Sequence, residues 1–289
     1  MIPYALKNGE PVSIAKARRG LACGCVCPAC GNRVMAKKGA ARVHHFSHYK
    51  MEECPHALES SLHLAAKAIL LRSGKIRLPA LELHGFERLL CHEKDWPFDQ
   101  VVLEKRHGQV IPDIALIKGQ RKILVEAAVT HAVGPAKLHR LRQLNLPVLE
   151  IDVAAIHLEL TGLGLAGDPR AFARKLVEET RHKKWLFHPW QQAVEYRIRQ
   201  AALRKKVRIN ARYRRFTVDG CPLKKRILRS GPMAGTAYAD LWQDCYFCPF
   251  CFEIEYRNKQ VGYRELQDRP DAVICRANLG TEEEVLKGL

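Results

Sequence analysis

The segment IPDIALIKGQRKILVEAAVTH, from Ile111 to His131, decides how the centre of this chain folds. Two apolar runs lie on either side of Gly119-Gln120, a pattern typical of a β-hairpin with a two-residue turn. Pairing outward from that turn places Asp113 directly opposite Glu126. Opposed side chains share a face about 5 Å apart, and two like charges there are destabilising without a cation. The hairpin therefore predicts a divalent-cation site, unless a longer turn shifts the register and turns each acid to water.

The bulk composition limits the classes of protein that the chain can belong to. Its 289 residues are 47% hydrophobic, enough for one sizeable core and about two domains. No apolar run approaches the ~20 residues of a membrane-spanning helix, and the N-terminus lacks the apolar centre of a signal peptide. We therefore expect a cytoplasmic protein without a membrane partner.

The positive charge is concentrated in one part of the chain. The net charge is +18, and residues 181–230 alone hold sixteen basic and two acidic residues, a net +14. Such an excess, with aromatic residues between the basic ones, favours a nucleic acid as a partner over a merely solvated surface. The basic residues that we expect to hold phosphate are Lys183, Lys184, Arg197, Arg199, Arg204, Lys205, Lys206 and Arg208.

A first cysteine cluster begins with the sequence CPACG at residues 27–31. Two residues between cysteines form a knuckle around one metal ion, and the fourteen residues from Cys30 to His45 suit a hairpin that returns a second ligand pair. We expect a structural zinc ion bound by four of Cys27, Cys30, His45, His48 and Cys54. The preferred second pair is His48 with Cys54, and His45 is the rival. The positions His44, Cys23 and Cys25 are less suited.

A second cysteine cluster lies near the other end of the chain, around the sequence CYFCPFC. The candidate ligands are Cys221, Cys245, Cys248, Cys251 and Cys275. Clustered cysteines in a reducing compartment favour metal over disulfides. Zinc is the first expectation for a subset of these cysteines, and an iron–sulfur cluster is the alternative.

The intervening chain predicts an α/β arrangement. The stretch ESSLHLAAK belongs to a helix on which Glu59, His63 and Lys67 share one stripe, which could be no more than an exposed charged face. A strand over 122–129, a helix and a strand over 147–153 predict a right-handed crossover with parallel strands. From residue 168 to about 213 the pattern predicts helices.

Three blocks of this sequence resemble the competence protein CoiA-like family of the PD-(D/E)xK nuclease superfamily. They are CPACG…HHFSHYKMEEC, ESSLHLAAK and the hairpin, and together they cover roughly residues 20–153. The resemblance implies a nuclease core with a mixed sheet flanked by helices. An N-terminal zinc-finger module and a C-terminal basic helical, zinc-ribbon-like region would flank that core. The C-terminal cysteines lie outside the resemblance.

The resemblance also implies roles for individual residues. Asp113 and Glu126 would bind catalytic Mg²⁺ or Mn²⁺, and Glu59 would assist the metal site or the attacking water. His63 and His131 would contact phosphate, although His131 could equally cap the turn that follows the strand.

One position departs from the superfamily pattern. The lysine expected two residues after the second acid is Ala128 here, so another lysine must neutralise phosphate or position the nucleophile. Lys67 is the first candidate, because its helix should pack on the sheet beside the acids. Lys137, on the crossover helix, is the second. Glu150 is a possible extra acid, but a surface or structural role suits it better.

Together these features predict four parts: a zinc-binding module (1–56), a PD-(D/E)xK nuclease-like domain (57–160), a basic helical region (161–216) and a cysteine-rich metal-binding module (217–289). The expected activity is Mg²⁺- or Mn²⁺-dependent hydrolysis of DNA, in recombination or processing or in defence against foreign DNA. A catalytically inactive nucleic-acid-binding protein is the alternative, which Ala128 favours. A nuclease that needs a protein partner or a second copy of itself is a third.

Overall fold

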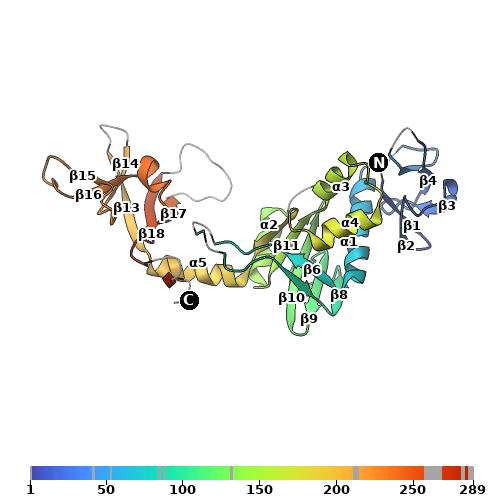
Figure 1. The fold of residues 1–289 in the computed structure, drawn as a ribbon, viewed down its shortest axis with the longest axis horizontal. Coiled ribbons are helices and arrows are strands. Elements are labelled where there is room, and N and C mark those ends of the chain that lie inside the picture. Colours follow the sequence, from blue (N-terminus) through green and yellow to red (C-terminus); the bar gives the residue numbers. More distant parts are fainter. Residues whose placement is uncertain are drawn as a thin grey trace. The chain divides into compact units, whose positions relative to one another are not determined.

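The computed structural model describes residues 2–40, 43–52, 54–83, 86–87, 89–130, 133–210, 215–256, 269–280 and 284–285. The chain divides into two compact units (Figure 1). The first contains residues 1–81 and 92–189, and the second contains residues 82–91 and 190–289. The zinc-type segment and the hairpin with its two acids therefore belong to the same unit.

The first unit begins with an antiparallel sheet in the order β2-β1-β3-β4-β5. Its first hairpin turns at Asn8-Gly9, where both residues have positive φ (52° and 80°), as a type I′ turn requires. The strands are β1 (Tyr4–Lys7), β2 (Glu10–Ser13), β3 (Gly20–Val26), β4 (Arg33–Lys37) and β5 (His45–His48).

A second sheet of the first unit has the order β12-β11-β10-β9-β8. The register predicted from the two-residue turn is confirmed, with Lys118 opposite Arg121 and Ile114 opposite Val125. Strands β10 and β11 are parallel, as predicted for the crossover through α2 (Pro135–Gln143). The strands are β8 (Gln100–Leu103), β9 (Ile114–Lys118), β10 (Arg121–Ala128), β11 (Val148–Asp152) and β12 (Lys183–Phe187). A separate pair consists of β6 (Lys75–Leu78) and β7 (Lys94–Pro97).

Helices cover both faces of this second sheet. One face packs against α1 (Ala57–Ser73), α3 (Val153–Gly162) and α4 (Pro169–Glu178), in a core that includes Val125. The other face packs against α2, where Leu141 lies with Leu124 and Val148. Because side chains alternate along a strand, Glu126 lies on the α2 face. The first unit is thus a mixed α/β structure, with Glu126 on the face that α2 covers.

The helical prediction for residues 161–216 is wrong in two places. Lys183–Phe187 forms β12 at the edge of the second sheet, and Leu203–Asn210 forms β13 in the second unit. Residues 206–209 of β13 alternate basic and apolar side chains, which fits a strand with one covered face, whereas Lys183–Phe187 has no such alternation and is a strand through its pairing with β11.

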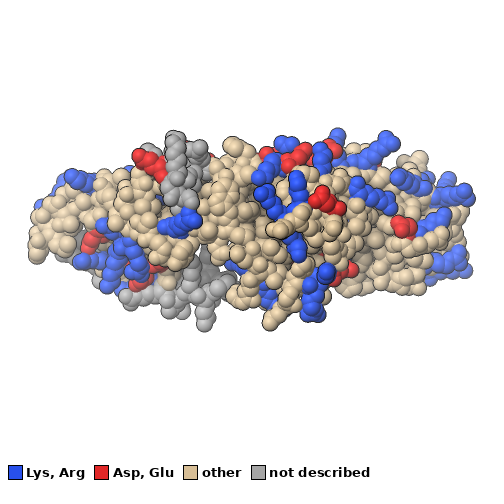
Figure 2. Space-filling model, turned by 90° about the horizontal axis from the view of Figure 1, so that it is seen from below, with Lys and Arg blue, Asp and Glu red and all other residues tan. Residues whose placement is uncertain are grey.

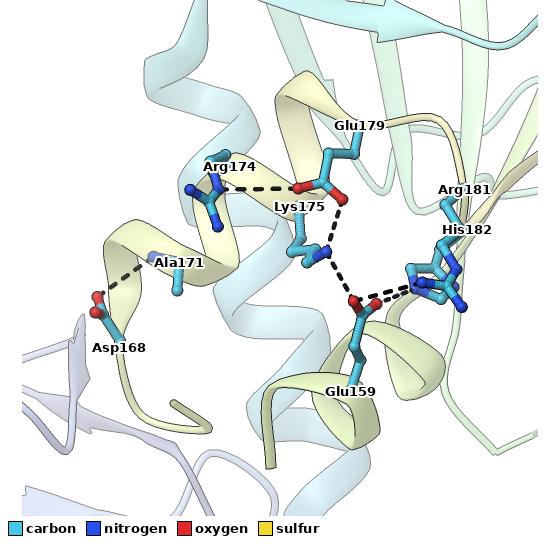
Figure 3. Close-up of polar contacts among 8 residues, drawn as sticks. All are labelled: Glu159, Asp168, Ala171, Arg174, Lys175, Glu179, Arg181 and His182. Carbon is cyan, nitrogen blue, oxygen red and sulfur yellow. Dashed lines mark hydrogen bonds and ion pairs between the residues drawn. The ribbon is translucent and has the colours of Figure 1, made fainter. Parts of the chain in front are cut away.

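A polar cluster between α3 and α4 precedes β12 (Figure 3). Lys175 donates to Glu159 at 2.8 Å and to Glu179 at 2.7 Å, and His182 Nε2 lies 2.7 Å from Glu159. The hydrogen bond from Lys175, followed by that from His182, lowers the pKa of Glu159 to about 2. These contacts join α3, α4 and the segment that enters β12, and so position the last strand of the sheet.

The second unit is built on a sheet in the order β15-β16-β14-β13-β18-β17. The first half of β13 pairs with β18 and its second half with β14. The elements are α5 (Pro189–Ala201), β13 (Leu203–Asn210), β14 (Arg215–Asp219), β15 (Arg226–Ile227), β16 (Ala237–Asp240), the π-helix η1 (Leu241–Cys245), β17 (Cys251–Tyr256) and β18 (Pro270–Cys275). Across the described parts of both units, no helix has the length and apolar character needed to span a membrane.

Candidate active site and metal centre

The two acids of the hairpin lie where its strands separate. The paired part of the hairpin ends at Ile114 and Val125, one step before Asp113 and Glu126. At that point Asp113 Oδ2 accepts a hydrogen bond from the backbone N–H of Ala127 at 2.9 Å. This bond holds the Asp113 carboxylate against β10, the strand that carries Glu126.

Glu126 is a buried carboxyl whose two oxygens differ in their partners. Its Oε2 accepts a hydrogen bond from Lys137 Nζ at 2.6 Å. Its Oε1 is buried and has no hydrogen-bond partner within the described residues. Burial raises the pKa of Glu126 to about 7; Asp113 and Glu150 add to the increase, and Lys137 opposes it. An unpartnered buried oxygen beside other carboxyls is an arrangement that a bound cation would complete.

Glu150 is a third acid at this position, although its sequence suggested a surface or structural role. It is directly paired with Glu126 in the parallel register of β10 and β11, and it is only 3% exposed. Lys184 Nζ, on β12, lies 2.6 Å from Glu150 Oε1, and the backbone N–H of Val133 donates to Oε2 at 3.3 Å. A crossover connection does not reveal the register of the strands that it joins, so the sequence held no signal that paired these two acids.

Helix α1 contributes polar side chains to an open cleft of about 870 Å³. Glu59, His63 and Lys67 line it together, as expected from their shared stripe, and Asp113 and Glu104 line it as well. His63 Nδ1 lies 3.7 Å from Asp113 Oδ2, which makes an ion pair when the imidazole is protonated. The cleft therefore connects α1 to one of the two hairpin acids.

Lys67 and Lys137, the two candidates to replace the lysine that is absent at Ala128, contact different carboxylates. Lys67 Nζ lies 2.6 Å from Glu104 Oε1 rather than on a hairpin acid. Lys137 instead contacts Glu126, because both lie on the α2 side of the sheet whereas α1 packs on the other side. The order of preference drawn from the sequence is thus reversed by this geometry. Glu104, which holds Lys67, had not been singled out.

The N-terminal cluster brings four donors together: Cys27, Cys30, His48 and Cys54. Their donor atoms all lie within 4.8 Å of one another. Cys27 Sγ is 3.8 Å from Cys54 Sγ, and Cys30 Sγ is 3.2 Å from His48 Nε2. Zinc bound tetrahedrally at about 2.3 Å separates its sulfur ligands by about 3.8 Å, so this group can hold a zinc ion.

The ligand set is the preferred one, and the local backbone explains it. Strands β4 and β5 place His48 opposite Val34, whereas His45 directs Nδ1 to the carbonyl of Val43 at 2.8 Å. In the knuckle, the backbone N–H of Asn32 is the largest of several hydrogen bonds that lower the pKa of Cys30 to about 6. A thiolate at neutral pH is the form that binds metal.

Lys183, which was expected to bind phosphate, is buried in the first unit. Lys183 is 7% exposed, and its Nζ donates to the carbonyls of Arg77 at 2.8 Å and Val177 at 3.3 Å. The prediction that it contacts nucleic acid is wrong, because the strand turns Lys183 inward and leaves Lys184 exposed. His131, the other candidate near the hairpin, lies outside the described residues.

The remaining basic candidates belong to the second unit, and most are exposed. Arg199 pairs with Glu253, Arg204 with Glu255 and Asp271, and Arg208 with Asp219. Arg197 and Lys206 are also exposed, whereas Lys205 is half-buried beside the C-terminal cysteines. The basic character of this unit is therefore partly compensated by acids on neighbouring strands.

The segment that contains the N-terminal cysteine and histidine cluster is similar to a known protein family. Residues 13–57 match the family model of the competence protein CoiA N-terminal domain. The match begins at the last residue of β2, covers β3, β4, β5 and all four donors of the zinc-type group, and ends before the hairpin acids. No curated protein and no solved structure matches the chain. The chain is therefore similar to competence protein CoiA in its N-terminal module.

Proposed function

We propose that the first unit is a metal-dependent nuclease that hydrolyses phosphodiester bonds of DNA. The observation that carries this proposal is the buried Glu126 carboxyl, with an unpartnered Oε1, next to Asp113 at the end of one hairpin. Burying an acid among other acids does not stabilise the fold. Residues whose pKa values are shifted in this way are concentrated at functional sites. The similarity to competence protein CoiA fits a role in DNA processing or recombination, or in defence against foreign DNA.

The donor set suits a hard divalent cation. Asp113, Glu126 and Glu150 offer carboxylate oxygens, which Mg²⁺ and Mn²⁺ prefer over thiols. Asp113 and Glu126 would hold the cation, with Glu150 as the neighbouring acid. When bound, the cation would activate water and stabilise the charge that develops on the phosphate.

The chain's own side chains have separate tasks in this proposal. Lys137 favours the ionised form of Glu126, and its half-exposed side chain leaves the ammonium group within reach of a phosphate. It thus supplies the positive charge that Ala128 lacks. Glu59 and His63, which line the open cleft beside Asp113, would orient water or phosphate there.

The charge distribution supports DNA as the substrate. The chain carries a net charge of +18, and Lys and Arg outnumber Asp and Glu on the face drawn in Figure 2. Lys and Arg side chains bind the phosphate backbone of DNA without reading its sequence, and the affinity of such binding falls steeply as the salt concentration rises. We therefore expect binding that is strong at low salt and independent of sequence.

Cleavage of DNA by the full chain tests the proposal. The purified protein should cut single-stranded, double-stranded or branched DNA with Mg²⁺ or Mn²⁺, and Asp113→Asn or Glu126→Gln should each reduce the rate by about 100-fold or more. Asp99→Asn is a matched control, because Asp99 is an exposed acid that accepts from Gly119 at the opposite end of the same hairpin. Absence of cleavage with all three substrates would refute the nuclease, as would cleavage that survives the double substitution Asp113→Asn/Glu126→Gln.

The second candidate, an inactive nucleic-acid-binding protein, rests on Ala128, and moving the lysine tests it. Lys137→Met should abolish most of the cleavage. Adding Ala128→Lys to Lys137→Met should recover part of it, because a side chain two residues beyond Glu126 lies on the same face of β10. DNA binding that is intact in every variant, with no cleavage in any of them, would favour the inactive protein.

A further inference from the structure

We propose that the second unit holds its own metal centre, bound by cysteine thiolates. Five cysteines line one pocket of this unit: Cys221, Cys245, Cys248, Cys251 and Cys275. They come from the loop after β14, the end of η1, the turn that follows it, the start of β17 and the end of β18. The match to the CoiA model ends at residue 57 and assigns nothing here.

The backbone gives three of these cysteines a regular arrangement. The N–H of Cys248 donates to the carbonyl of Cys245 at 3.0 Å, and the N–H of Cys251 donates to the carbonyl of Cys248 at 2.9 Å. Two consecutive turns therefore present three thiols at a constant spacing of three residues. Repeated Cys-x-x-Cys turns of this kind wrap a metal ion or cluster.

The other two cysteines reach the same place from separate strands. Cys275 is directly opposite Cys251 in the pairing of β17 and β18, which brings their Cβ atoms to within about 5 Å. Cys221 follows Gly220, whose φ of 64° turns the chain sharply after β14. Cys245 lies close enough to all four of the others to interact with them electrostatically. The fold thus gathers cysteines that are up to fifty-four residues apart in the sequence.

The surroundings suit a charged thiolate centre. Lys205, Lys225 and Asp244 line the pocket with the cysteines, and the two positive side chains stabilise thiolates. The adjoining core is small, with Val207, Val218 and Leu241 among its few buried apolar side chains. A separate apolar cluster that includes Phe252 and Ile274 packs on other parts of the same sheet, so a structural metal would add stability mainly at the end where the cysteines lie.

Two soft-metal chemistries use these donors. Within the described residues, no three of these sulfurs lie within 4.8 Å of one another, unlike the N-terminal donors, and a wider set suits an iron–sulfur cluster. The enclosed space is only about 30 Å³, which suits a single zinc ion. Both need four thiolates on a thiophilic metal, which is the chemistry we assign to this pocket. The assignment is independent of whether the first unit cuts DNA.

Metal content of the full chain tests the assignment. The protein is purified without oxygen or added metal, and zinc, iron and acid-labile sulfide are measured per chain. We expect two centres: either two zinc ions, or one zinc ion with iron and sulfide. Cys248→Ser/Cys251→Ser should lose the second centre alone, and Cys27→Ser/Cys30→Ser the first alone. Cys91→Ser, at a cysteine outside both groups, is the control and should lose neither.

A second measurement on the unsubstituted chain covers the case in which the variants fail to fold. Thiols are alkylated before and after metal removal and are located by mass spectrometry. Cys248 and Cys251 should be protected in the native protein and modified once the metal is gone, whereas Cys91 should react equally in both. Equal alkylation of Cys248 and Cys251 in the two states, or a metal content unchanged by their substitution, overturns the proposal.

Discussion

Lys183 offers the sharpest test of how charge is distributed in this protein. Its ammonium group is buried in the first unit and donates to two backbone carbonyls. Burial lowers the pKa of Lys183 to about 7, and Arg77 adds to the decrease, while Glu179, Asp95 and Glu93 oppose it. We expect Lys183→Met, which keeps the length of the side chain without its charge, to change how the stability of the first unit depends on pH.

The magnitude follows from the two pKa values. A decrease from 10.5 to about 7 corresponds to about 5 kcal/mol of unfavourable free energy when the lysine is protonated. Between about pH 7 and 10.5 the unfolded chain binds a proton that the folded chain has released, so the contribution of Lys183 to stability rises with pH. Below about pH 7 the full cost is present. From pH 7 to 9, stability should therefore increase by about 2 kcal/mol relative to a protein without this lysine.

Urea unfolding at pH 7, 8 and 9 measures this difference, with the first unit followed by its resistance to proteolysis. The stability of the natural chain minus that of Lys183→Met should rise by about 2 kcal/mol across the series. Lys94→Met, which removes an exposed lysine from β7, controls for the loss of one charge. A constant difference from pH 7 to 9 would refute the reasoning. Because the Lys183 ammonium is turned inward, the substitution should also leave the salt dependence of DNA binding unchanged.

Further outcomes follow from other parts of the first unit. Cys54→Ser should remove zinc from the N-terminal group and expose that module to limited proteolysis, and a normal zinc content would contradict the ligand set. Glu150→Gln should raise the Mg²⁺ concentration needed for half-maximal cleavage by about 10- to 100-fold without weakening DNA binding; an unchanged metal requirement would exclude Glu150 from the site. Lys67→Met should lower kcat less than Lys137→Met does, because Lys67 contacts Glu104 while Lys137 contacts Glu126; equal losses would contradict that distinction.

Local patterns predicted those parts of the fold that depend on nearby residues. The two-residue turn sets the hairpin register, so the pairing from Lys118–Arg121 to Ile114–Val125 could be predicted from the sequence alone, and it ends one step before Asp113 and Glu126. Ligand spacing likewise identified Cys27, Cys30, His48 and Cys54 as the preferred zinc set. In each case a short connection leaves few arrangements for the residues that it joins.

Contacts between distant segments could not be predicted in the same way. The pairing of Glu126 with Glu150 depends on the register of parallel strands, which the length of a crossover does not determine. The strand character of Lys183–Phe187 was concealed by its charge, because a lysine that satisfies backbone carbonyls in a core resembles a surface lysine in sequence. The partner of each lysine in turn depends on which helix covers which face of the sheet.

If the proposed nuclease is correct, the charges around the hairpin acids explain why Ala128 can stand where the superfamily pattern has lysine. The charged side chains gathered there are Asp113, Glu126, Glu150, Lys137 and Lys184. With all five ionised, three carboxylates and two ammonium groups leave one negative charge, which a divalent cation converts to one positive charge. In the proposed nuclease, one phosphodiester group of the substrate would then neutralise the site. A lysine at position 128 in addition to Lys137 would leave an excess positive charge, and would compete with the cation for the same acids. The alanine is therefore the residue expected on β10 once α2 supplies the lysine.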